Sequence, residues 1–126
     1  MGKAKTAVFF RESGTLTLAR PLLQYGKEVT TLRYDFDKVS GMQCLEALDR
    51  GHRGGEGQTD CSDRAGFLLF AEAVRACYER PEERPETADL ERLHPKDVII
   101  AARLGRGFFL RACMEALTRT GEDSPK

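Results

Sequence analysis

Residues 15–36 are rich in apolar residues that favour strands, and in the second half of this segment they alternate with polar residues. Gly26 and Lys27 interrupt the pattern with residue types that are typical of a tight turn. We therefore predict a β-hairpin in which residues 22–25 pair with residues 29–36. Two strands alone are only marginally stable in water, so this hairpin must pack on other elements.

Apolar residues recur at helical spacing in three later segments. The first begins at Ser40, where Ser40 and Gln43 fit a capping box, and it stops near Gly51. The second is predicted over residues 63–80, with Ser62 as its N-cap residue. Its apolar stripe is wide, which indicates that this helix packs on more than one side.

The third helical segment follows a charged linker and a single turn that Thr87 can cap. Pro95 takes the favoured first position of this helix, and Asp97 suits the positive end of its dipole. The apolar period continues to about Leu117, which predicts the end of the helix. We expect the second and third helices to form an antiparallel pair.

The stretch RLGRGFFLR, residues 103–111, combines basic, glycine and aromatic residues as RNA-recognition motifs do. That motif must lie on a strand, whereas the apolar residues here recur every three or four positions, so a helix is favoured. Gly105 then falls in the apolar stripe. A glycine inside a helix costs about 1 kcal/mol relative to alanine, so it needs a packing reason such as the close approach of another helix. That second helix could belong to this chain or to another.

These elements predict an α+β fold, with an N-terminal antiparallel β-hairpin or small sheet followed by three main helices. Residues 15–117 form the single domain of this prediction. Residues 1–14 are a leader, either flexible or containing a first strand at 7–10, and residues 118–126 are a disordered tail. A chain of 126 residues with 40% hydrophobic content suits one compact domain of this kind.

Twenty Lys and Arg residues balance twenty Asp and Glu residues, which gives a net charge of zero. This balance gives nucleic-acid binding no electrostatic help, and it leaves homo-oligomers open because charge repulsion between copies is weak. No stretch approaches the roughly 18 to 20 consecutive apolar residues of a membrane span, and the first residues lack the apolar core of a signal peptide. We expect an intracellular protein that binds neither nucleic acid nor membrane.

Residues suited to catalysis or metal binding form no recognisable motif. The chain has two histidines, neither beside a plausible nucleophile, and it has no hydrolase or zinc-protease signature. We therefore expect no enzymatic activity, no cofactor and no metal. Cys44, Cys77 and Cys113 fall on the apolar sides of helical patterns, which favours their burial as small hydrophobic residues. An alternative for the remaining thiol is a zinc site formed by Cys61 and His52.

Three stretches carry a resemblance to a known family. They are the hairpin stretch YGKEVTTLRYDFDKVSG, the alanine- and aromatic-rich second helix, and the final element LERLHPKDVIIAARLGRGFFL. Together they resemble the small tail assembly chaperones of tailed bacteriophages and prophages, over about residues 15–117. The N-terminal leader, the glycine-rich loop at 52–63 and the arginine-dense last helix depart from the family pattern.

The resemblance implies a non-catalytic protein in the cytoplasm of the bacterial host. Members of this family bind the long, helical tape-measure protein and help recruit tail-tube subunits during assembly. A small domain with excess apolar helix surface could cover such a partner. Two alternatives are a structural component of the virion tail and a small phage-encoded regulator that uses Arg103, Arg106 and Arg111 on nucleic acid.

The candidate partner-binding residues lie on the second and third helices. For any single apolar one, ordinary core packing is an equally good interpretation, since large apolar residues are usually buried. The candidates are Phe67, Phe70, Val74, Leu104, Phe108, Phe109, Arg103 and Arg106.

Overall fold

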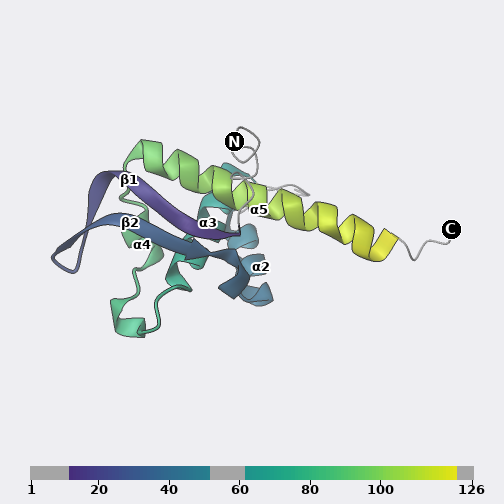
Figure 1. Cartoon of the computed structure of the whole chain (residues 1–126), viewed down its shortest axis with the longest axis horizontal. Coiled ribbons are helices and arrows are strands. Elements are labelled where there is room, and N and C mark those ends of the chain that lie inside the picture. The colour runs from purple at the N-terminus through teal and green to yellow at the C-terminus, as the bar shows by residue number, and fades with distance from the viewer. Residues whose placement is uncertain (1–11, 52–61, 122–126) are drawn as a thin grey trace, which may run out of the picture.

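A computed structural model describes residues 12–51 and 62–121, and it has the expected α+β fold. Strands β1 (Ser13–Gln24) and β2 (Lys27–Asp35) form an antiparallel hairpin. The elements that follow are η1 (Phe36–Lys38), α2 (Gly41–Gly51), α3 (Asp63–Arg75), η2 (Pro81–Glu83), α4 (Thr87–Leu90) and α5 (Pro95–Gly121). In Figure 1 the long helix α5 runs across the molecule and extends past the hairpin and α2.

The hairpin turn is formed by Tyr25 and Gly26, whose φ angles are both positive, at 53° and 78°. Positive values at both central positions belong to the turn type that matches the twist of a hairpin. The sequence-based position of this turn, at Gly26 and Lys27, is therefore one residue too late. Lys27 already pairs with Gln24 as the first residue of β2.

Strand β1 is longer than predicted, because it begins at Ser13 and includes the end of the predicted leader. Leu16 pairs directly with Leu32, and both side chains are buried. The added part of the strand is therefore stabilised by the core as well as by the hydrogen bonds of the hairpin. The predicted first strand at 7–10 lies outside the described residues.

The pairing of β1 with β2 is interrupted between Thr17 and Leu22, where the register shifts. Within this bulge the backbone N–H of Ala19 donates to both carboxylate oxygens of Asp97, at 2.9 and 3.0 Å. Asp97 lies in the first turn of α5 and only 1% of its surface is exposed. Its carboxylate therefore joins α5 to the hairpin, in addition to its predicted place at the positive end of the helix.

Helix α3 forms the centre of the core. Every residue from Ala65 to Val74 is buried, and the helix packs against the hairpin, α2 and α5. This arrangement confirms the expectation that α3 packs on more than one side. The helix ends at Arg75 and not at residue 80. The N–H groups of Cys77 and Tyr78 bond to carbonyls only three residues back, which tightens the chain into a turn.

Two of the predicted helix starts are confirmed by their capping hydrogen bonds. The N–H of Gln43 donates to the hydroxyl oxygen of Ser40 at 3.1 Å, and the N–H of Ser40 donates to the Gln43 side chain at 3.0 Å. The hydroxyl oxygen of Ser62 accepts from the N–H of Ala65 at 3.1 Å at the start of α3. These local signals position both helices along the chain.

The predicted cap of the short helix α4 is wrong by one residue. Thr87 is the first helical residue, and Glu86 is the N-cap residue in a reciprocal capping box with Asp89. The N–H of Glu86 donates to the Asp89 carboxylate at 2.9 Å. A carboxylate accepts a hydrogen bond from a backbone N–H at least as well as a hydroxyl does. Glu86 can therefore take the capping role that the sequence-based prediction gave to Thr87.

Helices α3 and α5 cross where two glycines meet. A Cβ atom added to Gly105 would overlap the backbone of Gly66, and one added to Gly66 would overlap the backbone oxygen of Ala102. The helices are antiparallel, because Asp63 at the start of α3 pairs with Arg106, far along α5. The close approach that Gly105 permits is therefore to this protein's own α3.

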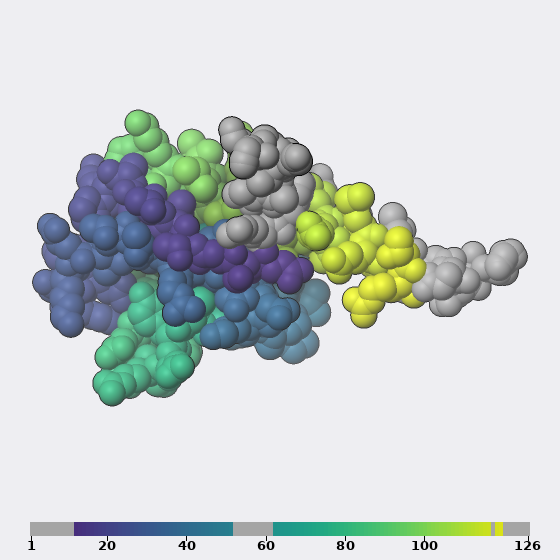
Figure 2. All heavy atoms as spheres, viewed as in Figure 1, coloured from purple at the N-terminus to yellow at the C-terminus, as the bar shows by residue number. Residues whose placement is uncertain are grey.

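Helix α5 continues to Gly121, past its predicted end at Leu117, so residues 118–121 of the predicted tail are helical. It has 27 residues against 13 in α3, so about half of α5 has no α3 beside it. Figure 2 shows this second half standing out from the body of the molecule. Residues 110–116 are all exposed.

Candidate functional site

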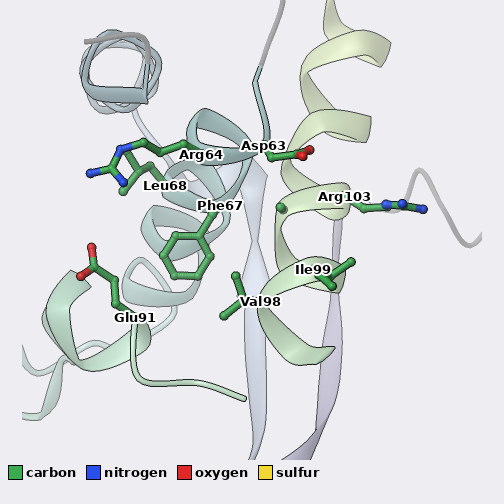
Figure 3. Close-up of a pocket in the computed structure, with 9 residues that line it drawn as sticks. Asp63, Arg64, Phe67, Leu68, Glu91, Val98, Ile99 and Arg103 are labelled. Carbon is green, nitrogen blue, oxygen red and sulfur yellow. The ribbon is translucent and has the colours of Figure 1, made fainter. Parts of the chain in front are cut away.

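A groove of about 560 Å³ lies between α3 and α5 and is open to solvent. The antiparallel packing of these two helices brings together residues from their facing sides and one residue that follows α4. Figure 3 shows the groove and its lining. The lining residues are Asp63, Arg64, Phe67, Leu68, Glu91, Val98, Ile99, Ala102 and Arg103.

The floor of the groove is apolar and its rim is charged. Phe67, Leu68 and Ala102 are buried beneath the opening, so the floor is part of the domain core. On the rim, Arg64 and Arg103 form no side-chain hydrogen bond or ion pair with the described part of the chain. In Figure 3 these two arginines stand on opposite sides of the groove, toward the start of α3, whereas Glu91 lies toward the other end.

A second feature continues from the groove along α5. Ile99, Leu110 and Met114 are 55%, 47% and 68% exposed. They share one side of the helix, because 11 residues make about three turns and four make about one. We call these three residues the α5 stripe. At 1.5 Å per residue the stripe is about 22 Å long, which is the length of about four helical turns.

Three candidate residues, Phe67, Phe70 and Val74, lie in the core of the protein. Phe70 and Val74 have no exposed surface, and Phe67 is 6% exposed at the floor of the groove. The ring of Phe70 packs 5.3 Å from that of Tyr34 on β2. Their assignment to partner contact is therefore corrected for Phe70 and Val74, which stabilise the fold because other elements of the domain cover them.

The candidates Leu104, Phe108 and Phe109 are half-buried and pack against the core. The ring of Phe108 stacks on Phe36 at 4.7 Å with an interplanar angle of 7°. Phe108 therefore packs α5 against η1, and all three residues pack α5 against the core of the domain. The side of α5 that remains exposed carries other residues.

Two of the arginines in the last helix are paired with acids of this chain. Arg106 pairs with Asp63 at 3.1 Å, and Arg111 pairs with Glu115 at 3.8 Å. Arg103 is exposed and stands at the groove. A shared basic strip for nucleic acid would have to compete with these internal pairs.

The α5 stripe and Arg64 were not predicted from the sequence. Leu110 and Met114 lie outside the predicted apolar stripe of the last helix, because they are about 140° and about 180° around the helix from Gly105. They are exposed because that side of α5 faces away from Gly105, where α3 packs. Arg64 carried no signal of its own, because only the crossing of α3 with α5 brings it to the groove.

The prediction of three buried cysteines holds only in part. Cys44 and Cys77 are half-buried, whereas Cys113 is exposed on the free half of α5. Burial raises the pKa of the Cys44 thiol, and burial raises that of Cys77 although Arg33 and Lys38 partly oppose the shift. At neutral pH, the ionised fraction of each of these two thiols is therefore smaller than that of an ordinary cysteine.

We expect iodoacetamide at pH 7.5 to label Cys113 roughly tenfold faster than Cys44 or Cys77, since the thiolate is the reactive form and access is limited at the buried sites. Peptide mapping by mass spectrometry over a time course measures each cysteine separately. Raising the pH should speed the labelling of Cys44 and Cys77, because their raised pKa keeps them protonated at lower pH. Equal rates at all three positions would contradict this arrangement of α5.

The described residues contain no group of three or more His, Cys, Asp or Glu side chains that could hold a metal ion. Cys61 and His52, the alternative zinc pair, lie outside the described residues. None of the helices in the described ranges is long and apolar enough to cross a membrane.

Comparison of the chain with protein-family models, with curated proteins and with solved structures gives no match. The groove, the α5 stripe and the sequence of the hairpin and the last two helices are therefore the features from which a function can be inferred.

Proposed function

We propose that this protein is a non-catalytic tail assembly chaperone of a tailed bacteriophage or prophage, acting in the cytoplasm of the bacterial host. It binds the tape-measure protein and helps recruit tail-tube subunits. The observation that supports this proposal best is the α5 stripe, which offers exposed apolar side chains along about four turns of one helix.

Helical partners bind most readily to surfaces of this shape. An amphipathic helix places an apolar side chain on one face about every turn, and it buries that face against a partner helix or groove. Leu110 and Met114 have this spacing, and Ile99, about three turns before Leu110 on the same side, adjoins the groove between α3 and α5. A long helical tape measure has the complementary geometry.

We expect tagged tape-measure protein, co-expressed with this chain, to retain it on an affinity resin. The double change Leu110→Glu and Met114→Glu should lower the retained amount at least about tenfold, because charges then replace apolar groups at an interface. The matched control is Met42→Glu with Leu45→Glu, two apolar residues on α2 that are 66% and 59% exposed.

The control variant should be retained as the parent chain is. No retention of the parent chain would overturn the proposed function. Equal retention of both double variants would move the interface away from the α5 stripe. A structural tail component would be present in purified particles by mass spectrometry, whereas a chaperone is depleted from them.

A further inference from the structure

We draw no further inference here: the strongest candidate, the groove between α3 and α5 with its apolar floor and with Arg64 and Arg103 directed out of its opposite sides, carries none, because nothing in the described part of the chain shows what covers it.

Discussion

Replacing Gly105 with alanine should destabilise the domain by about 3 kcal/mol, the upper end of what overpacking usually costs. Helix propensity alone gives the opposite sign, because alanine in a helix interior is favoured over glycine by about 1 kcal/mol. The result is decided by the crossing of α3 and α5, where the added Cβ would overlap the backbone of Gly66. Backbone atoms cannot turn aside as the end of a long side chain can, so the two helices must separate.

Urea unfolding followed by far-ultraviolet circular dichroism measures this loss. The control is Gly41→Ala at the start of α2, where an added Cβ meets nothing within 4 Å. That variant should be as stable as the parent or slightly more so. Gly66→Ala should destabilise in the same way as Gly105→Ala, and the double variant should lose less than the sum because one contact is disturbed twice. A Gly105→Ala protein with parental stability would exclude the close crossing.

Local signals in the sequence were enough to predict most of the secondary structure. The capping pair Ser40 and Gln43 and the N-cap residue Ser62 act within a few residues of themselves, so they can be read directly. The hairpin is predictable for the same reason. Its turn was misplaced by one residue because Tyr25 adopts a positive φ that its residue type does not suggest.

The candidate site was harder to predict, because exposure depends on which element covers which. The helical period places Phe70 and Phe109 on apolar faces alike, yet Phe70 is fully buried and Phe109 is only partly buried. The difference is that α3 lies between other elements, whereas α5 runs past the end of α3. A sequence pattern identifies the apolar face of a helix but not the partner that covers it.

The contact between Asp97 and Ala19 illustrates the same limit, since the two residues are 78 positions apart. The sequence indicated the place of Asp97 at the start of a helix, where an acid is favoured by the dipole. Nothing local to Asp97 predicts that its carboxylate also accepts the N–H of a strand bulge. That second role follows only from the way α5 packs on β1.

Asp97→Ala should therefore destabilise the domain by about 2–3 kcal/mol, because the buried charged acceptor is lost and the N–H of Ala19 loses its hydrogen-bond partner. Asp97→Asn should lose roughly half as much, since an amide oxygen can still accept from Ala19 while the favourable charge at the helix start is gone. The matched control is Asp49→Ala, an exposed acid on α2, which should change stability by less than about 0.5 kcal/mol. Urea unfolding of the three variants measures these differences.

Removing the Asp97 carboxylate should also make the wall of the groove more mobile. Val98 and Ile99 form its wall and follow Asp97 directly in α5, so releasing the start of the helix from β1 loosens that wall. Hydrogen exchange in Asp97→Ala should then be faster in the first turns of α5 than in α3, where the core remains intact. Equal protection of both helices, with parental stability, would mean that the hairpin holds α5 by apolar contacts alone and that the carboxylate contributes nothing to positioning the groove.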